Sequence, residues 1–413
     1  MNIWIVDHYS SEPQYGGIQR QFDFANGLSK RGYNVVVIAS AFSHFSHSYL
    51  FDSDISYSEL NDKAHYVYLK TPAYDTNRSI KRTLNTLSFK NAVIKYEKQI
   101  AEKYGKPDVV VGCSIHPFTW IAAYHAAKKH NAKFFAEVRD LWPATWIYNW
   151  GMSRRHPKAI LFGAIEKWAY DHADKIIYSM SRGDRYICDE LGYPREKTVW
   201  IDQPMDCERF DTNALRYDEL PKEIKEFIGD SFLCVFTGYY MPYEGVMEML
   251  EAAKLTRDMP IKYLFLGSGK EEQKMHQYAE ENHLTNVFVG GRIDKELIPA
   301  VLRRADICLA HLAIRGNPES YKFDASKNKI NEYMYSDSCI IYGTYIENQF
   351  VKTSGAGFTI EPYNAQAFAD TIEQVYKMPE KDRKQFGSSA KEYVLQNNTL
   401  EKLTDKYNKL ISG

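Results

Sequence analysis

Several features that would place the chain outside the cytosol are absent from the sequence. The six cysteines form no C-x-x-C pair, and several lie in apolar runs, where a free thiol behaves as a small hydrophobic side chain. The N-terminus, MNIWIVDHYSSEPQ, lacks a basic leader followed by an apolar core, and no run of about 18 apolar residues is present to cross a bilayer. We therefore expect a reduced, cytoplasmic protein that is neither exported nor threaded through a membrane.

The chain also lacks a strong excess of either charge and the signatures of two kinds of cofactor site. It has 52 lysines and arginines against 53 aspartates and glutamates, which argues against a general nucleic-acid-binding protein. The first apolar run is followed by SSEPQYGGIQR instead of G-x-G-x-x-G, so a dinucleotide site of the Rossmann type is not expected. No His/Cys cluster has metal-ligand spacing, and we expect neither a metal nor a cofactor.

What the sequence does contain is a repeated alternation of short β-rich runs and helical stretches. Residues 2–9 and 34–40 are predicted strands around a helical stretch at 17–32, and the alternation restarts after a charged, helix-prone connection at 208–230. Such alternation predicts parallel sheets covered by helices on both faces. We therefore expect an α/β protein with two doubly wound Rossmann-like domains, 1–205 and 206–395, and a C-terminal helix, 396–413, that can pack back on the first domain.

Two glycine pairs lie where a predicted strand passes into a helix. Gly16 and Gly17 do so in the first domain, and Gly267 and Gly269 in the second. Ligands of open α/β sheets bind beyond the carboxyl ends of the strands, so the cleft between the domains is the expected site. Glycines at these positions would let the backbone approach a phosphate or sugar and would aim helix N–H groups at an anion, although they would serve a flexible turn equally well.

The stretch SKNKINEYM carries the densest set of candidate ligand-binding groups. Ser326 is a plausible N-cap, and Lys327 and Lys329 would then lie in the first helical turn, where the helix dipole favours negative charge. A bound pyrophosphate would resolve this conflict, and Glu332, one turn later, could accept hydrogen bonds from ribose hydroxyls. The alternative is a solvated helical face that binds nothing.

Several stretches together resemble one known family. SKNKINEYM followed by CIIYG, with GGIQRQFDFANGLSKRGYNVVVIAS, AEVRDLWP and YLFLGSG, resembles the retaining nucleotide-sugar glycosyltransferases of the GT-B fold, family 4, and most closely the bacterial branch that builds surface polysaccharides. The resemblance covers nearly the whole chain and implies two domains facing across a cleft, with a nucleoside diphosphate sugar as donor, UDP-sugar being favoured. In the family's E-x7-E pair, Glu332 would hold the ribose and Asp324 would lie beside the transferred sugar.

The sequence departs from this family at several places, among them IDQPMD, which replaces the usual P-N-G-V-D before the second domain. An arginine commonly follows the strand glycine, here Gly238, and a lysine precedes the next glycine, but Tyr239 and Glu244 stand at those places. Lys327 and Lys329, with Arg292 or Arg315, would have to bind the diphosphate instead. Asp324 is shorter than the glutamate of the family.

Three residues of the first domain are candidates for the acceptor and sugar side of the reaction. His116 follows a predicted strand, and Arg139 and Asp140 follow the next one, so all three would lie at strand carboxyl ends. The resemblance implies that this region contacts the donor sugar and the acceptor, with electrostatic support of the leaving diphosphate as the main contribution of the protein. His116 could instead be a structural hydrogen-bonding group, and Arg139 and Asp140 an internal ion pair.

A tryptophan stripe follows these residues. Pro143 can open a helix and Gly151 can close it, which would put Trp142, Trp146 and Trp150 on one face beside basic residues. That face would suit contact with the inner face of an anionic cell membrane, which would bring a lipid-linked glycan to the cleft. The alternative is plain packing on the domain.

These observations predict a retaining glycosyltransferase of the hexosyl or N-acetylhexosaminyl type, acting on a glycan or lipid-linked glycan in surface polysaccharide synthesis. Two other functions remain open on the same residues. One is a GT-B-fold sugar-nucleotide epimerase, and the other is a non-catalytic carbohydrate-binding subunit, which the departures at Tyr239 and Glu244 favour.

Overall fold

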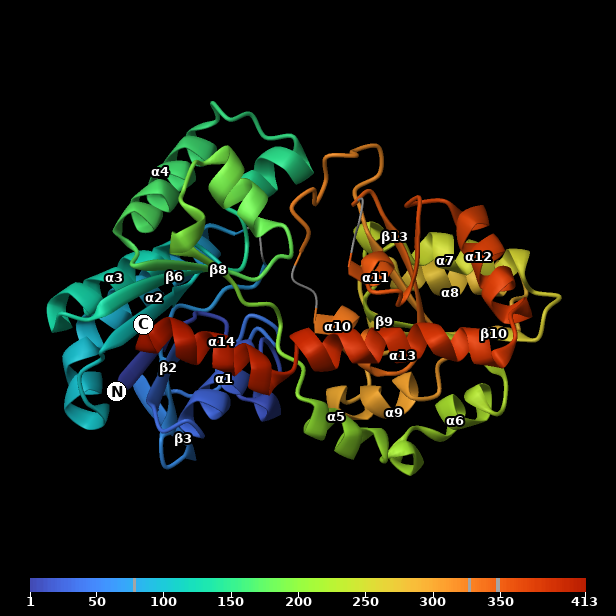
Figure 1. Ribbon diagram of the computed structural model, residues 1–413, viewed down its shortest axis with the longest axis horizontal. Coiled ribbons are helices and arrows are strands. Elements are labelled where there is room, and N and C mark those ends of the chain that lie inside the picture. Colours follow the sequence, from blue (N-terminus) through green and yellow to red (C-terminus); the bar gives the residue numbers. More distant parts are fainter. Residues whose placement is uncertain (77–78, 326–327, 347–349) are drawn as a thin grey trace. The chain divides into compact units, whose positions relative to one another are not determined.

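The computed structural model describes residues 1–76, 79–325, 328–346 and 350–413, and the chain divides into two compact units (Figure 1). Unit 1 comprises Met1–Pro204, residues 323–325 and Leu400–Gly413. Unit 2 comprises Met205–Lys322 and residues 328–399. Each unit has its own sheet and its own core, as expected for two doubly wound domains.

Unit 1 is built on an eight-stranded sheet with the strand order β3-β4-β2-β1-β5-β6-β7-β8. All neighbours are parallel except β3 and β4, which are antiparallel. The strands are β1 (Asn2–Val6), β2 (Asn34–Ser40), β3 (Ile55–Asn61), β4 (Ala64–Leu69), β5 (Val109–Cys113), β6 (Lys133–Val138), β7 (Lys175–Tyr178) and β8 (Thr198–Trp200).

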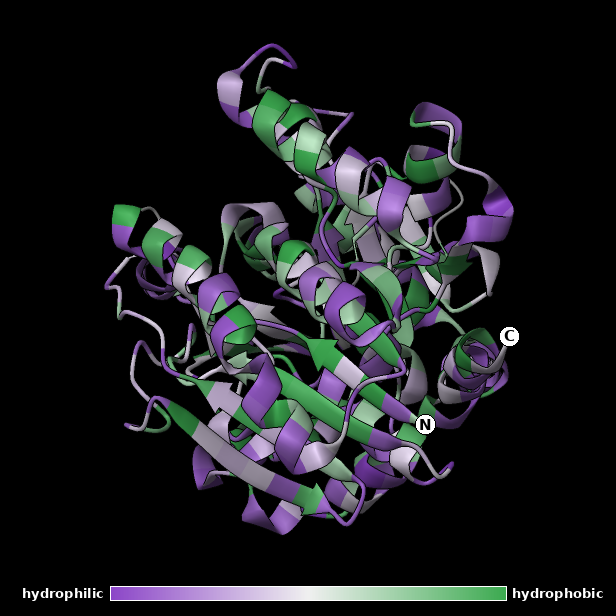
Figure 2. Cartoon of the chain, turned by 90° about the vertical axis from the view of Figure 1, so that its left-hand side faces the viewer, coloured by the Kyte–Doolittle hydropathy of each residue, from purple (hydrophilic) through white to green (hydrophobic). Residues whose placement is uncertain are grey.

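The helices of unit 1 cover both faces of this sheet because its central strands are apolar on both sides. Trp4 and Val6 point to a core formed with α2, α3 and α4, whereas Ile3 and Ile5 point to a core formed with α1 and α14. Figure 2 shows these strands as largely hydrophobic between helices of mixed hydropathy. The helices are α1 (Arg20–Ser29), α2 (Ile80–Tyr104), α3 (Phe118–His130), α4 (Pro157–His172) and α14 (Leu400–Ser412), with short helices η1 (Pro13–Tyr15), η2 (Thr145–Asn149), η3 (Arg185–Glu190) and η4 (Arg195–Lys197).

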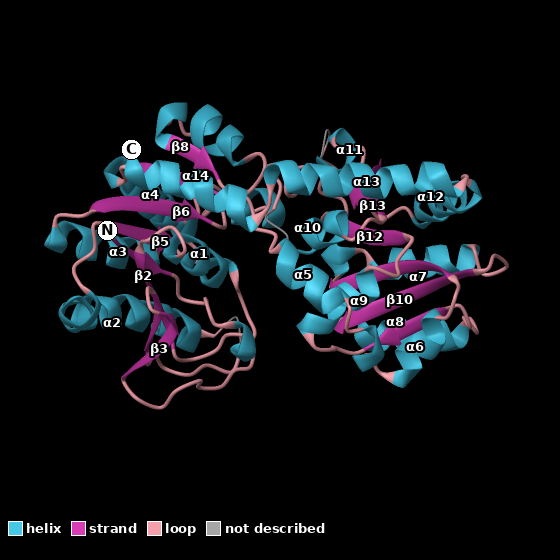
Figure 3. Ribbon diagram, turned by 60° about the horizontal axis from the view of Figure 1, so that its bottom comes forward, coloured by secondary structure: helices cyan, strands magenta, loops and turns pink. Residues whose placement is uncertain are grey.

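Unit 2 is built on a six-stranded parallel sheet with the order β11-β10-β9-β12-β13-β14. The strands are β9 (Phe232–Tyr239), β10 (Ile261–Ser268), β11 (Val287–Gly290), β12 (Ile307–Leu312), β13 (Cys339–Thr344) and β14 (Gly357–Ile360). Apolar residues of α7, α8 and α12 cover one face of it. Figure 3 shows its strands and helices by type.

The helices of unit 2 include the one predicted from SKNKINEYM. That helix, α10, is described from Asn328 to Tyr335. The helices described in unit 2 are α5 (Cys207–Ala214), α6 (Lys222–Ile228), α7 (Val246–Leu255), α8 (Glu272–Glu281), α9 (Ile298–Leu302), α10 (Asn328–Tyr335), α11 (Phe350–Thr353), α12 (Ala365–Lys377) and α13 (Glu380–Asn397), with short helices η5 (Tyr217–Glu219), η6 (Pro242–Glu244) and η7 (Lys295–Leu297).

Two negative findings concern the described part of the chain. None of its helices is both long and apolar enough to span a bilayer. Within the same residues, no group of three or more His, Cys, Asp or Glu side chains is placed to hold a metal ion.

Candidate functional site

The first candidate site lies where the strand order of unit 1 reverses. β1 lies between β2 and β5, and open α/β sheets bind their ligands beyond the carboxyl ends of the strands at such a reversal. Asp7 and His8 follow β1 directly, and His116 follows β5. The topology thus brings three buried polar side chains to one switch point.

His8 and His116 form a direct pair. His8 Nδ1 lies 2.6 Å from His116 Nε2, and the His8 ring is stacked on Phe89 with centroids 4.3 Å apart. Burial lowers the pKa of His116 to about 3 and lowers the pKa of His8 as well, so both rings are neutral near pH 7. One ring must therefore donate to the other. Of the two remaining nitrogens, His8 Nε2 and His116 Nδ1, one carries a proton and one does not, and both are buried. His8 also interacts with Asn85, whereas His116 Nδ1 has no hydrogen-bond partner in the described residues.

Asp7, Arg139 and Asp140 add charge at the same edge. Burial raises the pKa of Asp7 and of Asp140 to about 6, and the Arg139 guanidinium opposes this rise in both. Asp7 Oδ1 accepts a hydrogen bond from the Tyr9 backbone N–H at 3.1 Å. The Asp7 carboxyl group also interacts with the Gln21 side chain, whereas Arg139 Nε and Nη1 are buried with no hydrogen-bond partner among the described residues. Such unsatisfied groups are what a polar ligand could pair with.

An ion pair that the sequence analysis did not single out lies beneath these residues. Arg20 Nε of α1 lies 2.7 Å from Glu137 Oε1 of β6, and both side chains are fully buried. Gln21 Nε2 and the Cys113 thiol donate to Glu137 Oε2 at 2.7 and 2.9 Å. Burial would raise the pKa of Glu137, but Arg20 and Arg139 outweigh it and hold this pKa below its usual value. This pair ties α1 to the centre of the sheet.

The glycines before α1 serve a tight turn. Gly16 and Gly17 have φ angles of +71° and +89°, which side chains rarely adopt. A methyl group at Gly17 would lie 2.8 Å from Ser11 Oγ and 3.0 Å from the Phe45 ring. The backbone conformation therefore explains why glycine stands at these two positions. Contact of Gly16 and Gly17 with a donor stays a prediction.

The second candidate site lies at the corresponding reversal in unit 2. β9 lies between β10 and β12, and Gly238 of β9 is in register with Gly267 of β10. A methyl group at Gly267 would lie 1.8 Å from the Gly238 carbonyl oxygen, and one at Gly269 would lie 2.3 Å from the Tyr240 carbonyl oxygen. Two of the predicted donor-site glycines, Gly267 and Gly269, are thus required by close backbone packing, and the third, Gly238, has a φ of +140°, which side chains rarely adopt.

Lys329 brings a cation to this edge. Its Nζ lies 2.5 Å from Glu244 Oε2 and 4.3 Å from the centroid of the Phe236 ring, and a methyl group added at Gly238 would lie 3.2 Å from it. The Lys329 and Glu244 side chains are only 13% and 9% exposed. Glu244 stands where the family has a lysine, and in this structure it forms an ion pair with Lys329 of α10.

Arg292 and Arg315, the two arginines considered for the diphosphate, lie in different surroundings. Arg292 Nε donates to Ser268 Oγ at the end of β10, at 2.7 Å, and its guanidinium lies over the ring of the half-exposed Tyr239. Arg315 forms an ion pair with Glu248 and lies 4.4 Å over the Tyr363 ring. Of the two arginines, Arg292 therefore lies nearer to the glycines, because Ser268 is the last residue of the strand that carries Gly267.

Glu332 is half-buried in α10 between two anchored neighbours. Asn331 accepts a hydrogen bond from Asn398 at 3.0 Å, and the Tyr333 hydroxyl accepts one from the backbone N–H of Thr237 at 2.7 Å. These contacts fix the rotation of α10 about its axis against β9. The ribose role of Glu332 remains a prediction.

The predicted partner of Glu332 packs with unit 1. Asp324 is buried, and its Oδ2 accepts a hydrogen bond from Ser181 Oγ at 2.5 Å, while Phe323 packs on Tyr148 and Tyr186. Asp324 therefore belongs to unit 1, whereas Glu332 belongs to unit 2. Lys327 lies outside the described residues.

The three tryptophans of the stripe differ in exposure. Trp142 and Trp146 have ring centroids 4.7 Å apart, and both pack on Phe162. Trp150 is 60% exposed. Trp150 is therefore the most exposed of the three, whereas Trp142 and Trp146 are partly buried against Phe162 of α4.

Comparisons with known proteins agree with this architecture. Residues 15–209 match the family Glycosyltransferase Family 4, and residues 219–393 match the family described as Glycosyl transferases group 1. The putative colanic acid biosynthesis glycosyl transferase WcaI of Escherichia coli is 23% identical over 80% of this chain and 78% of its own length. The chain is a glycosyltransferase of the GT-B type.

Solved structures share the fold of this glycosyltransferase at low identity. Sucrose-phosphate synthase from Thermosynechococcus elongatus superposes with a TM-score of 0.74 at 16% identity, covering 99% of this chain and 98% of its own. Anabaena Alr3699/HepE in complex with UDP superposes with a TM-score of 0.70 at 15% identity, covering 100% of both chains. These likenesses establish the fold.

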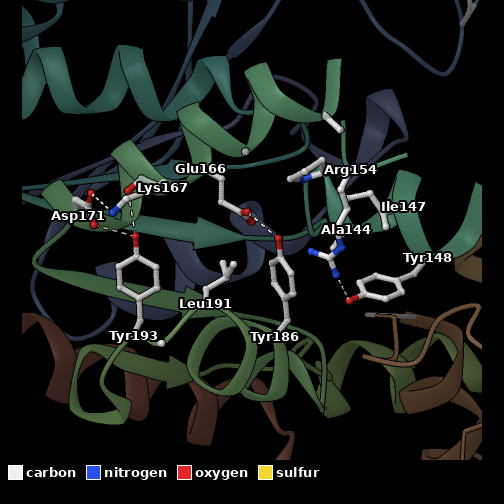
Figure 4. A pocket seen from close by; sticks show the side chains of 14 residues that line it. Ala144, Ile147, Tyr148, Arg154, Glu166, Lys167, Asp171, Tyr186, Leu191 and Tyr193 are labelled. Atoms are coloured by element: carbon white, nitrogen blue, oxygen red, sulfur yellow. Dashed lines mark hydrogen bonds and ion pairs between the residues drawn. The ribbon is translucent and has the colours of Figure 1, made fainter. Parts of the chain in front are cut away.

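The glycosyltransferase also has a pocket in unit 1 that the sequence analysis did not foresee. It has a volume of about 470 Å³ and lies between η2, α4 and η3 (Figure 4). Glu166 is 2% exposed, and its carboxyl group accepts hydrogen bonds from Tyr170 and Tyr186 at 3.1 and 2.8 Å. Burial raises the pKa of Glu166 to about 8, so this carboxyl group is mainly protonated at pH 7.

Sequence reasoning missed His8, Arg20, Glu137 and Glu166. His8 could have been found, because it stands one residue after Asp7 at the carboxyl end of the first apolar run. Glu137, inside the apolar run KFFAEV, was a second signal, since a charged residue within a buried strand needs a partner. The partner itself, Arg20, is 117 residues away and was not identifiable from local sequence.

Proposed function

We propose that this glycosyltransferase transfers a sugar from a nucleoside diphosphate sugar, with UDP-sugar favoured, to a glycan or lipid-linked glycan acceptor, with retention of the anomeric configuration. The observation that carries the proposal is the position of Lys329. The Lys329 ammonium group lies beside Gly238 at the switch point of a parallel sheet, where glycines end the strands. A cation at such a position suits a diphosphate. The UDP complex of the structurally similar Anabaena protein supports the choice of nucleotide.

The proposed roles follow from the two switch points. In unit 2, Lys329 and Arg292 balance the charge of the leaving diphosphate and Glu332 accepts hydrogen bonds from the ribose. Because such groups stabilise the charge that develops as the sugar departs, they account for the reaction without a metal ion, and we propose that none is required. In unit 1, the neutral His8–His116 pair leaves His116 Nδ1 without a partner in the described residues, which suits a sugar hydroxyl group.

The likeness to WcaI supports a place in the synthesis of bacterial surface polysaccharide, since that relative is described as a putative colanic acid biosynthesis enzyme. The choice between a hexosyl and an N-acetylhexosaminyl donor depends on pocket shape. Activity with a panel of UDP-sugars would identify the donor. NMR analysis of the anomeric configuration of the product would test retention.

Nucleotide binding is tested first by thermal unfolding with UDP, GDP or ADP. A ligand at about 100 times its Kd adds about 2.7 kcal/mol of stability, so UDP should raise the unfolding midpoint of the wild type by several degrees. Lys329→Ala and Glu332→Ala should lose most of this shift. Lys352→Ala, which removes an exposed lysine of α11, is the matched control and should keep it. No response of the wild type to any nucleotide would refute the proposal.

The Lys329–Glu244 pair also favours a second candidate, a non-catalytic carbohydrate-binding subunit. Glu244 offsets the charge of Lys329, which would weaken diphosphate binding. Such a subunit would bind glycans and release no nucleoside diphosphate from any donor. A sugar-nucleotide epimerase would instead give a new free sugar isomer from donor alone, so product analysis with and without acceptor separates the three functions.

A further inference from the structure

The pocket of unit 1 is elongated along one side of α4. Its lining on this helix runs from Ala159 to Asp171, which is about 18 Å of helix, and η2 and η3 complete its walls (Figure 4). Its volume of about 470 Å³ lies within the range of sites that hold small ligands. The class of ligand that it suits follows from the groups that line it.

Gly163 keeps the middle of this pocket open. A glycine inside a helix lowers the stability of that helix relative to alanine. Packing does not require the glycine, because a methyl group at Gly163 would meet, outside its own helix, only Pro143 among the described residues, at 3.7 and 3.8 Å, which is ordinary van der Waals contact. The missing side chain instead leaves room in the pocket, which Gly163 lines.

Glu166, Tyr170 and Tyr186 carry neutral polar groups at the centre of the pocket. Glu166 and Tyr186 line it, whereas Tyr170 is fully buried and does not. Because the Glu166 carboxyl group is mainly protonated at pH 7, the three side chains hold three O–H hydrogens and share two hydrogen bonds. One O–H group is therefore left to donate to a ligand, and a buried donor without an acceptor is costly.

The charged side chains of the pocket lie toward its two ends and are paired. At one end Lys167 forms an ion pair with Asp171 at 2.9 Å, and the Tyr193 hydroxyl donates to the same carboxylate at 2.8 Å (Figure 4). At the other end Arg154 lies 3.6 Å from Glu190. The centre of the pocket is therefore uncharged, which disfavours a phosphate or a carboxylate as ligand, since a buried charge needs a partner.

We propose that this pocket binds a neutral saccharide ring, at a site separate from the two switch points. The O–H groups of Glu166 and Tyr186 pair with sugar hydroxyl groups, and the rings of Tyr148, Tyr186 and Tyr193, which all line the pocket, pack on the apolar C–H faces of the sugar. A hydrocarbon chain would leave the buried O–H group without an acceptor. The ring is either a free sugar or one unit of a longer glycan, and the test separates the two.

The pocket also adjoins the segment that carries Asp324. The rings of Tyr148 and Tyr186 each lie 5.3 Å, between centroids, from the ring of Phe323, the residue before Asp324. A saccharide that holds these two tyrosines would therefore also steady Phe323. This gives a glycosyltransferase a use for a sugar bound outside its donor site.

The test is saturation-transfer NMR of the full chain with methyl glycosides of glucose, galactose and N-acetylglucosamine and with lactose and cellobiose, each with and without UDP. At least one of these saccharides should bind, and UDP should not displace it, because UDP is proposed to bind unit 2. Tighter binding of a disaccharide than of its methyl glycoside assigns the pocket to a glycan, and equal binding assigns it to a free sugar. Saccharide binding does not depend on transfer, so this inference and the proposed function can fail separately.

Two pairs of variants locate the site. Gly163→Leu should lower saccharide affinity by at least about tenfold by filling the pocket, whereas Ala164→Leu, at the next residue, which is exposed and outside the pocket lining, should bind as the wild type does. Tyr186→Phe should lower affinity by about three- to tenfold, because it removes a hydroxyl group from the lining. Tyr170→Phe removes the other hydrogen bond to Glu166 and should leave the affinity unchanged.

Thermal unfolding of each variant checks the fold. Gly163→Ala is a milder second variant, because its methyl group makes only ordinary contacts, and it should lower the affinity without lowering the unfolding midpoint. The proposal is overturned if no saccharide binds, or if Gly163→Leu and Tyr186→Phe bind as tightly as their controls. Binding of n-octanol without binding of any saccharide would make this an apolar site and would overturn it as well.

Discussion

Glu166 offers the sharpest test of the energetics of unit 1. Its carboxyl group is buried between Tyr170 and Tyr186, and the neighbouring Lys167 pairs with Asp171 instead, at 2.9 Å (Figure 4). Burial raises the pKa of Glu166 from 4.5 to about 8. The folded state therefore keeps a proton that the unfolded state releases above pH 4.5.

The sign of the pH dependence follows from this difference. A carboxyl group with a raised pKa in the folded state contributes full stability below the pKa of the unfolded state, and this contribution is lost as the pH rises toward the folded-state pKa. The slope in that interval is about 1.4 kcal/mol for each pH unit. Between pH 5 and pH 8, the protein should therefore lose about 3 kcal/mol through Glu166.

The variant Glu166→Gln removes this loss, because an amide keeps its shape and does not titrate. Its unfolding midpoint relative to that of the wild type should rise by about 6 to 12 °C between pH 5 and pH 8. Glu190→Gln is the matched control, since Glu190 also accepts a hydrogen bond from a tyrosine, Tyr148, but is exposed. A midpoint difference between Glu166→Gln and the wild type that does not change with pH would refute the assignment of a protonated, buried carboxyl group.

Two further predictions concern the strand edges of the two units. Gly267→Ala should destabilise unit 2 by about 1 to 3 kcal/mol, because the new methyl group meets a backbone oxygen, whereas Gly291→Ala, at a site with no atom within 4 Å, should change little. Urea unfolding of both variants checks this. Glu137→Gln should cost about 3 to 5 kcal/mol by leaving the buried Arg20 unpaired, against less than about 1 kcal/mol for Asp405→Asn in an exposed pair. Equal losses in the last two variants would contradict the importance of burial.

The two sheets could be predicted because their central strands are buried on both faces. Runs such as NVVVIAS at 34–40 are apolar at every position but the ends, which is characteristic of parallel sheets. The antiparallel pair β3 and β4 was not among the predicted strands. β3 is a partly exposed edge strand of sequence ISYSELN, so its hydrophobic signal is weak.

The candidate site was predictable as a set of residue types and not as a set of contacts. Helical spacing correctly indicated that Trp142 and Trp146 lie together, but it could not tell that both would pack on Phe162 of α4 while Trp150 stays exposed. The pairing of Lys329 with Glu244 was equally hidden, because the two residues are 85 positions apart. Local patterns give the face on which a side chain lies, whereas its partner is set by the tertiary fold.

The same topological rule places a different chemistry in each unit. β1 in unit 1 and β9 in unit 2 both lie where the strand order reverses, and in both cases polar side chains gather at the strand end. In unit 1 the paired rings of His8 and His116 are neutral near pH 7, since burial lowers the pKa of each. In unit 2 the strand end carries glycines and Lys329. A neutral imidazole pair suits hydroxyl groups, and a lysine beside closely packed glycines suits phosphate, which is why we propose that unit 1 contacts a sugar hydroxyl group and unit 2 the diphosphate.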